Sequence, residues 1–287
     1  MKFIRYFFEY LIIKLLFLFF RLIGYKNSSN FGSSIGKIFG PIFKSKKIIE
    51  TNIKTFRPDI NEKSQKNLSD EMWGNYGRIF AEYMFIKDFR MGKLDQHIKI
   101  NGLDYLDEIK KRGKPVVFVS AHFSNFELMA MHLEKYGIKL GALYRPLNNF
   151  FLNKTMEKIR QNYICKIQIK KGLAGIRDIL NLFKKNVSLA MMIDQRVTEG
   201  IKCEFFNKPA YTTTIPAQLV KKFNCQIVPV YIERINKFDF EITINRPISF
   251  DEKEDLYTIT KSLNEWLEKM IKNKPEQWIW SHNRWKL

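Results

Sequence analysis

The sequence has few cysteines, and none of them lies in a pattern typical of a structural or metal-binding site. Cys165, Cys203 and Cys225 are odd in number and form no C-x-x-C pair. Neither a disulfide framework nor a zinc site is therefore indicated. The pattern predicts a reducing, cytoplasmic setting for the main domain, and we expect no metal and no cofactor.

The chain also lacks a clean hydrophobic run of about 20 residues, the length that a membrane-spanning helix needs. Residues 1–25 are dense in Phe, Leu and Ile, but Glu9, Lys14 and Arg21 interrupt them. Lys14 and Arg21 share one helical face. The segment could lie in the membrane interface, or it could span the membrane with its charged side chains extended to the membrane surface. Alternatively, it could pack on the core of the protein as a soluble helix. A cleaved signal peptide is disfavoured, because no A-x-A site follows and the first alanine is Ala81.

Acidic residues are scarce relative to basic ones. Asp and Glu number 29 against 49 Lys and Arg, which gives a formal net charge of +20. Such an excess suits an anionic partner, such as nucleic acid, an anionic membrane, a phosphorylated substrate or an acidic carrier protein, although a general lysine bias of the surface would give the same count. RNA-binding signatures are absent, so we expect no nucleic acid partner. The Lys-rich stretch 37–54 would keep the following domain cytoplasmic.

The length and pattern predict an α/β fold. With 287 residues and 45% hydrophobic residues, the chain can form one large domain with a sizeable core. Residues 27–91 read as mostly helical, and strands and helices alternate after them. This alternation predicts a single domain, 26–287, with a largely parallel or mixed central sheet covered by helices, after an N-terminal membrane-anchor helix at 1–25. The expected strands are 114–121, 138–144, 166–170, 187–194, 225–235 and 240–245, and the expected helices are 125–137, 150–163, 173–186, 215–224 and 255–278.

Polar side chains lie at or just after the ends of three of these expected strands. His122 comes after the first strand, Arg145 comes after the second, and Asp194 ends the fourth. In sheets of this kind the functional residues lie beyond the carboxyl ends of the strands. We therefore expect these three groups at one edge of the sheet.

His122 has the chemistry of a general base, and Glu127 follows it five residues later. A carboxylate can fix the tautomer of a histidine and stabilise its imidazolium, and such a base could activate a substrate hydroxyl without a serine or cysteine nucleophile. Alternatively, Ser124-x-x-Glu127 is a capping box at a helix start. The "GSSIG" at 32–36 matches the hydrolase nucleophile motif, but it follows a helix rather than a strand, so we interpret it as a connector.

Several blocks in this order resemble one family. They are "HFSNFE" at 122–127, "YRPLNN" at 144–149, "IDQRVTEG" at 193–200, "FFNKPAYTTTIPA" at 205–217, "IVPVYIER" at 227–234 and "PEQWIWSHNRWK" at 275–286. Nearly the whole chain resembles the bacterial lipid A (lauroyl or myristoyl) acyltransferases, within the lysophospholipid acyltransferase superfamily.

The resemblance implies a specific activity. Members act on the cytoplasmic face of the inner membrane and move a fatty acyl group from acyl-acyl carrier protein to a hydroxyl of a Kdo-bearing lipid A precursor. The acidic carrier protein, the anionic lipid acceptor and the inner membrane would be the partners of this chain. By the same resemblance, His122 is the general base and Glu127 its partner.

The resemblance also implies substrate-binding residues. Arg145 would bind a phosphate or carboxylate, and Asp194 would position Arg145 or a substrate group. Ser124 and Asn125, within the histidine motif, would contact substrate. The terminal "HNRWK" matches a family signature whose chemical role the sequence does not reveal.

Two departures from the wider pattern leave alternatives open. The F-P-E-G block of the superfamily is absent, and Arg196 stands where some relatives carry a second acid. The alternatives are an acyltransferase for another acceptor, such as lysophosphatidate or an aminolipid, and a non-catalytic basic protein that binds membrane surfaces.

Overall fold

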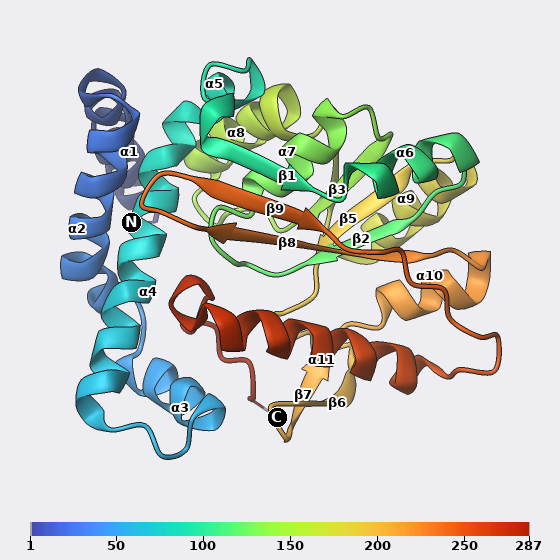
Figure 1. The fold of residues 1–287 in the computed structure, drawn as a ribbon. Helices are drawn as coiled ribbons and strands as arrows, with labels where there is room; N and C mark the ends of the chain where they lie inside the picture. The colour runs from blue at the N-terminus through green and yellow to red at the C-terminus, as the bar shows by residue number, and fades with distance from the viewer. Residues whose placement is uncertain (1, 287) are drawn as a thin grey trace.

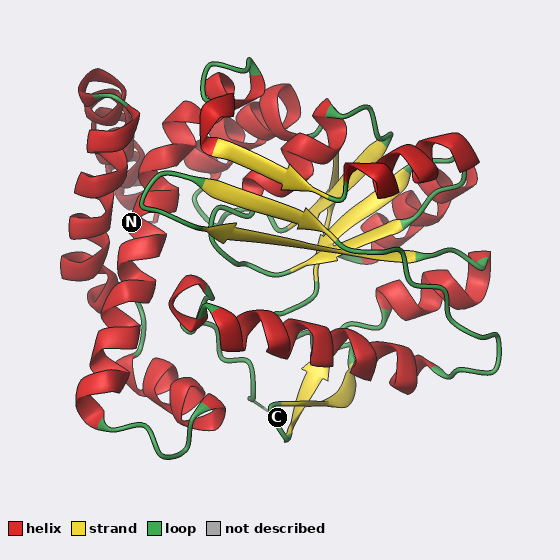
Figure 2. Ribbon diagram, viewed as in Figure 1, coloured by secondary structure: helices red, strands yellow, loops and turns green. Residues whose placement is uncertain are grey.

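A mixed seven-stranded β-sheet forms the centre of the protein, and helices cover both of its faces (Figure 1 and Figure 2). The computed structural model describes residues 2–286. The strands are β1 (Ile98–Asn101), β2 (Val117–Ser120), β3 (Leu140–Tyr144), β4 (Ile167–Lys170), β5 (Ser188–Met192), β6 (Ile201–Phe205), β7 (Lys208–Thr212), β8 (Ile227–Arg234) and β9 (Phe240–Ile244). The helices are α1 (Lys2–Ile23), α2 (Tyr25–Phe43), α3 (Lys46–Phe56), α4 (Glu62–Glu82), α5 (Ile86–Arg90), α6 (Leu103–Arg112), α7 (Glu127–Lys135), α8 (Phe150–Ile159), α9 (Leu173–Lys184), α10 (Ile215–Phe223) and α11 (Leu256–Asn273). Single turns are η1 (Tyr83–Phe85), η2 (Asp95–His97), the π-helical η3 (Arg160–Ile164) and η4 (Pro275–Gln277).

The strand order is β1-β9-β8-β2-β5-β3-β4, and every neighbouring pair is parallel except β8 and β9. Only five residues, 235–239, separate β8 from β9, and so short a connection permits only an antiparallel pair. The expected mixed α/β sheet is confirmed. Because β2 is parallel to β8, its carboxyl end points toward the layer of α1, α2 and α4 (Figure 1).

Some elements of the structure were not predicted from the sequence. The edge strand β1, helix α6 and the separate hairpin β6–β7 were not expected. The last helix ends at Asn273 rather than 278, because Pro275 lacks the N–H that would continue it and opens η4 instead.

The central strands are buried on both faces, which is why they read as continuous apolar runs. Val117 and Val119 of β2 belong to the apolar cluster under α10 and α11, while Phe118 belongs to the cluster that includes Leu128 and Met131 of α7. The loop after β2 therefore leaves a rigid element.

The "GSSIG" segment lies inside α2 and is not a connector, so that interpretation was wrong. Its glycines let α2 approach α4 closely. A Cβ on Gly36 would lie 2.1 Å from the carbonyl oxygen of Trp73, and one on Gly32 would lie 2.4 Å from that of Gly77. Only glycine fits such a crossing.

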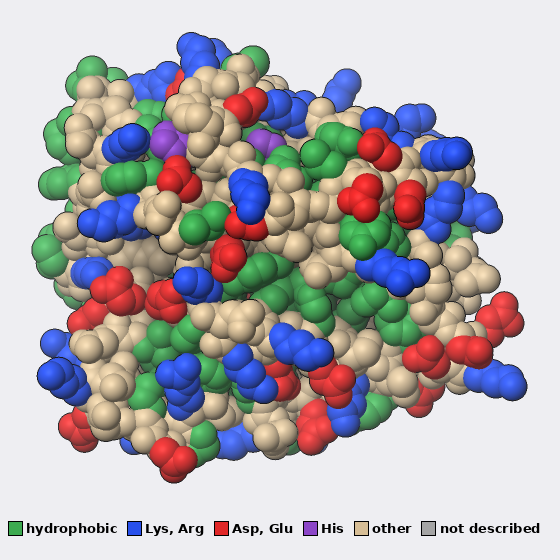
Figure 3. All heavy atoms as spheres, in the orientation of Figure 1, with side chains coloured by type: hydrophobic (Ala, Val, Ile, Leu, Met, Phe, Trp, Pro, Cys, Tyr) green, Lys and Arg blue, Asp and Glu red, His purple; other side chains and the backbone are tan. Residues whose placement is uncertain are grey.

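Helix α1 has a packed side and an exposed side. Phe17 and Phe20 are buried against α4, and Arg21 forms an ion pair with Asp88. Figure 3 shows apolar side chains along the edge formed by α1 and α2. The exposed apolar residues of α1 are Phe3, Ile4, Phe7, Phe8, Leu11, Ile12, Leu15, Leu18, Phe19 and Leu22, and those of α2 are Phe31, Ile38, Phe39 and Ile42. Within residues 2–286, no helix has both the length and the apolar character needed to cross a membrane.

Candidate active site

His122 and Asp194 meet because their strands are adjacent and in register. Strands β2 and β5 are parallel, with Ser120 opposite Met192, and each polar residue lies two positions beyond its strand. The Ile193 amide donates to the Ser120 carbonyl oxygen at 2.9 Å, which extends the pairing past the strand ends. The expected convergence of these two residues at the sheet edge is confirmed.

The Asp194 carboxylate holds the histidine at two points. Oδ1 lies 2.9 Å from His122 Nδ1, and Oδ2 accepts the His122 backbone N–H at 3.0 Å. Oδ2 also accepts the indole N–H of Trp278 at 2.9 Å. An ionised carboxylate only accepts, so Nδ1 carries the ring proton and the lone pair lies on Nε2. The Asp194 side chain is fully buried, whereas 22% of the His122 side chain is exposed.

The environment of Asp194 favours its charged form. Burial alone would raise the pKa of this carboxyl, but the His122 imidazole, the His122 backbone N–H and the Trp278 indole together hold the pKa below its ordinary value. His122 also contacts the ring of Phe126 edge to face, with centroids 4.8 Å apart. The imidazole is thus oriented from two sides.

Glu127 is not the partner of His122 in the structure, which corrects the sequence interpretation. Its Oε1 accepts from Arg160 Nε at 3.0 Å and from Nη2 at 2.5 Å. Both side chains are nearly buried, at 10% and 15% exposure. Burial opposes the Arg160 charge, but the Glu127 carboxylate outweighs it and raises the pKa of Arg160. The pair fastens the start of α7 to η3.

The capping box is not formed either. The residue before α7 is Phe126, which makes no side-chain cap, and Ser124 adopts a left-handed backbone with φ of 48°. The Ser124 hydroxyl is buried and has no hydrogen-bond partner in the part of the chain that the structure describes. Its backbone N–H donates to Gln277 O at 3.0 Å. Ser124 therefore turns the chain between β2 and α7, and its burial contradicts direct contact with substrate.

Asn125 belongs to a buried polar network rather than to an open binding surface. It is 1% exposed, and its Nδ2 donates to Glu82 Oε2 at 3.0 Å. Arg234 donates to both oxygens of Glu82, at 2.7 and 3.0 Å. The network joins α4, β8 and the loop after His122. No local sequence pattern predicts this network, because its members are far apart in the chain.

Arg145 stands at the same sheet edge but does not contact Asp194. It is exposed and follows β3, as Lys171 follows β4. The two strands are paired at Tyr144 and Lys170, and the Lys171 amide donates to Tyr144 O at 2.9 Å. Burial and, more weakly, the nearby Arg145 charge lower the pKa of Lys171, although Glu199 opposes them. Asp194 thus does not position Arg145. Instead Arg145 and Lys171 form a cationic edge.

The C-terminal "HNRWK" block docks on the β6–β7 hairpin. Arg284 is fully buried and donates to Tyr211 O and to Thr212 Oγ1, both at 2.7 Å, and burial lowers its pKa to about 10. Trp285 stacks on Phe205, with centroids 5.6 Å apart. This docking holds the segment that carries Trp278 against the site.

His282 of the same block lies beside the catalytic candidates. Its Nε2 accepts the Arg196 backbone N–H at 2.9 Å, and Asn52 donates to its carbonyl oxygen at 2.6 Å. Burial lowers the pKa of His282 to about 4, so its imidazole is neutral near neutral pH. The role of this residue in the structure is therefore to hold the loop after β5.

A comparison with protein families gives one match along the whole sequence. The profile of the bacterial lipid A biosynthesis acyltransferases matches residues 1–287. The chain belongs to this family. It is an O-acyltransferase, and the resemblance noted from the sequence blocks is confirmed.

Individual relatives are distant but aligned over most of their length. A lipid A biosynthesis acyltransferase of Haemophilus influenzae is 25% identical, over 88% of this chain and 83% of its own. The lipid A biosynthesis lauroyltransferase of Escherichia coli is 23% identical, over 89% and 84%, and the myristoyltransferase is 21% identical, over 86% and 77%. A solved 1-acyl-sn-glycerophosphate acyltransferase from Thermotoga maritima aligns over 95% of this acyltransferase and 97% of its own chain, with 17% identity and a TM-score of 0.39.

Proposed function

We propose that this acyltransferase moves a fatty acyl group from acyl-acyl carrier protein to a hydroxyl of a Kdo-bearing lipid A precursor, with His122 as the general base. The observation that carries the proposal is the His122–Asp194 pair. A fully buried carboxylate fixes Nδ1, while Nε2 has no partner within residues 2–286 and the ring is partly exposed. This is the arrangement that a base acting on a substrate hydroxyl requires.

The reaction needs no acyl-enzyme intermediate. His122 Nε2 takes the proton of the acceptor hydroxyl while the hydroxyl oxygen attacks the carbonyl carbon of the acyl thioester. Asp194 stabilises the imidazolium that forms, because it already accepts the Nδ1 proton. The carbon–sulfur bond then breaks, and the departing thiolate of the carrier receives the proton from Nε2. The products are an ester and a free thiol.

The charge of the protein supports both proposed substrates. Acyl carrier protein is acidic, and the acceptor carries phosphates and carboxylates, so a net charge of +20 would attract both. The exposed Arg145 and its neighbour Lys171 lie at the carboxyl ends of β3 and β4, on the edge where His122 lies. We propose Arg145 as a contact to an anionic group of a substrate.

We further propose that residues 1–25 lie in the interface of the inner membrane and that residues 26–287 form the catalytic domain on its cytoplasmic face. The support is the row of exposed aliphatic and aromatic side chains on α1 and α2. On an ordinary protein surface, exposed apolar residues are scattered singly, whereas here they gather on two neighbouring helices.

The test is acyl transfer with purified protein, acyl-acyl carrier protein and Kdo-bearing precursor, followed by mass spectrometry of the lipid. We expect the acceptor to gain the mass of one acyl chain and His122→Ala to abolish the gain. Transfer to lysophosphatidate but not to the lipid A precursor would overturn the proposed acceptor. Full activity in His122→Ala would overturn the proposed base.

A further inference from the structure

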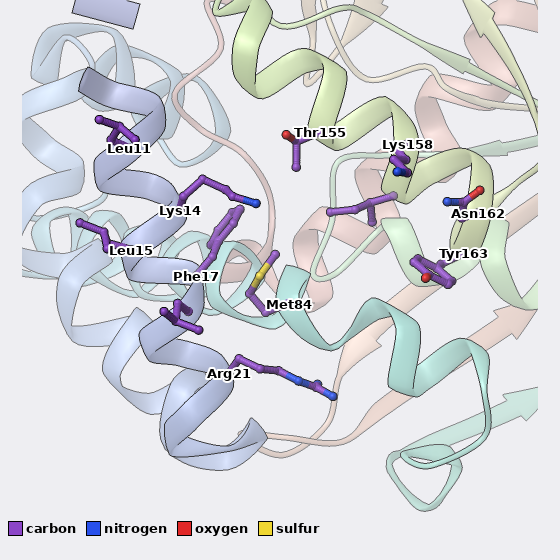
Figure 4. Close-up of a pocket in the computed structure, with 12 residues that line it drawn as sticks. Leu11, Lys14, Leu15, Phe17, Arg21, Met84, Thr155, Lys158, Asn162 and Tyr163 are labelled. Carbon is purple, nitrogen blue, oxygen red and sulfur yellow. The ribbon is translucent and has the colours of Figure 1, made fainter. Parts of the chain in front are cut away.

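A groove of about 810 Å³ separates α1 from α8 and η3 (Figure 4). Its walls are mostly apolar and include Phe17 of α1, Met84 of η1 and Ile159 of α8. The volume falls in the range of roughly 300–1,000 Å³ that is typical of small-molecule sites. The groove is therefore large enough for part of a lipid.

Two lysines give this apolar groove an uncompensated positive charge. Lys14 extends from α1 into the space between the helices, and Lys158 lies on the facing side of α8 (Figure 4). Neither ammonium has an ion-pair partner within residues 2–286, and no Asp or Glu lines the groove. The third cation of the lining, Arg21, is already neutralised by Asp88. Two like charges beside apolar walls favour an anion attached to a hydrocarbon chain.

The groove is continuous with the exposed apolar face of α1. Leu11, Leu15 and Leu18 line the groove and are also exposed, at 39%, 67% and 58%. A lipid could therefore enter from the surface that we propose lies in the membrane interface.

The other wall of the groove is formed by α8 and η3. Ile159, Asn162 and Tyr163 line the groove, and Arg160, in the same turn, holds Glu127 at the start of α7. The carboxyl end of β2, from which His122 extends, points toward the same helical layer (Figure 1). The segment that forms this wall therefore also contacts, through Arg160, the helix that follows the proposed base.

We propose that this groove binds the anionic lipid acceptor. A phosphate or carboxylate of its head group lies between Lys14 and Lys158, and an acyl chain lies along the apolar wall. The identity of this lipid rests on the proposed function, whereas the chemistry of the site rests on the groove itself.

The test uses the full-length protein in mixed micelles and a matched pair of double variants. Lys14→Gln with Lys158→Gln removes the two groove charges. Lys2→Gln with Lys154→Gln removes two charges from the same two helices, at positions that are exposed, as Lys14 and Lys158 are, but do not line the groove. The probe is the Kdo-bearing lipid A precursor, with dihexanoyl phosphatidate, dihexanoyl phosphatidylcholine and inorganic phosphate as competitors. Affinity for the precursor and the KM for it in acyl transfer are both measured.

We expect the groove variant to weaken binding and raise KM at least about tenfold, the scale for losing charge-assisted contacts, and the control variant to change both less than about twofold. Equal losses in the two variants would overturn the site in favour of general charge attraction. Displacement of the precursor by short-chain phosphatidate at equal affinity would assign the groove to bulk anionic lipid and overturn the acceptor assignment.

The two proposals fail separately. If the parent protein transfers acyl groups but the groove variant binds and reacts normally, the groove proposal is wrong and the proposed function stands. If the precursor binds through the two lysines but no transfer occurs, the groove binds this lipid and the proposed reaction is wrong.

Discussion

Replacing Asp194 with Asn should remove most of the activity and keep the fold. The Asn carbonyl oxygen can take the place of Oδ2, where the His122 amide and the Trp278 indole both donate. The Asn NH₂ group then faces His122 Nδ1. Two N–H groups cannot hydrogen-bond to each other, so Nδ1 must become the acceptor and the ring proton moves to Nε2. That proton occupies the lone pair that the base needs.

The size of the loss follows from the charge that Asp194 supplies. With Oδ1 and Nδ1 2.9 Å apart, the charge centres of carboxylate and imidazolium lie about 4 Å apart, which corresponds to about 4 kcal/mol at an effective dielectric constant of about 20. At about 1.4 kcal/mol per tenfold in rate, kcat should fall about 10³-fold. The free energy of unfolding should fall by only about 1.5–3 kcal/mol, the contribution of one hydrogen bond to a charged group.

The matched control is Glu127→Gln. It removes the charge opposite Arg160 and leaves the Nδ1–Asp194 bond intact, so we expect a lower melting temperature and a smaller loss of kcat. Steady-state acyl transfer measures both variants. Proton NMR adds a direct readout, since the downfield Nδ1–H resonance should persist in Glu127→Gln and vanish in Asp194→Asn. The opposite pattern, or nearly full activity in Asp194→Asn, would refute the assigned pairing.

Three further predictions test other parts of the structure. Trp278→Phe should lower kcat about tenfold, because it removes a donor to the buried Asp194 carboxylate. The indole of Trp280 donates to a backbone carbonyl instead, so Trp280→Phe should cost similar stability with little change in kcat. Equal kcat values in the two variants would contradict this prediction. Burial lowers the pKa of His132 to about 4, below its unfolded value of about 6.5, so the free energy of unfolding should fall as pH drops through that window. His132→Leu should remove up to about 3 kcal/mol of that fall in urea titrations at the two ends of the window, and an unchanged pH slope would exclude His132 as its source. Gly36→Ala should lower the melting temperature because its Cβ meets the backbone of α4, whereas Ala at the exposed Ser34 should not, and equal melting temperatures would argue against the close crossing.

The position of the site was predictable because it follows from strand order. Buried parallel strands read as apolar runs, and their carboxyl ends meet at one edge. His122 and Asp194 were therefore expected together without knowledge of any contact. The short edge strand β1 and the hairpin β6–β7 were not expected, and runs of four or five residues with polar members are weak signals, although β4, a run of the same kind, was predicted.

The partner of His122 was misassigned because spacing along the chain does not determine the direction of a side chain. Five residues separate His122 from Glu127, but the left-handed Ser124 turns the chain between them. Helix α7 then begins with Glu127 directed to Arg160. The acid that contacts the imidazole comes instead from the loop after the neighbouring strand β5, 72 residues away in sequence.

Trp278 shows a second limit of the sequence, and it also explains the terminal block. A tryptophan 84 residues from its acceptor gives no local signal that it donates to a carboxylate. The carboxylate it contacts is fully buried, and a buried charge is stable only when its acceptor positions are filled. The tail that supplies this donor is held in place by the buried Arg284 and by Trp285. The terminal block can therefore affect catalysis without touching a substrate, because it fixes the donor that supports the charge of Asp194.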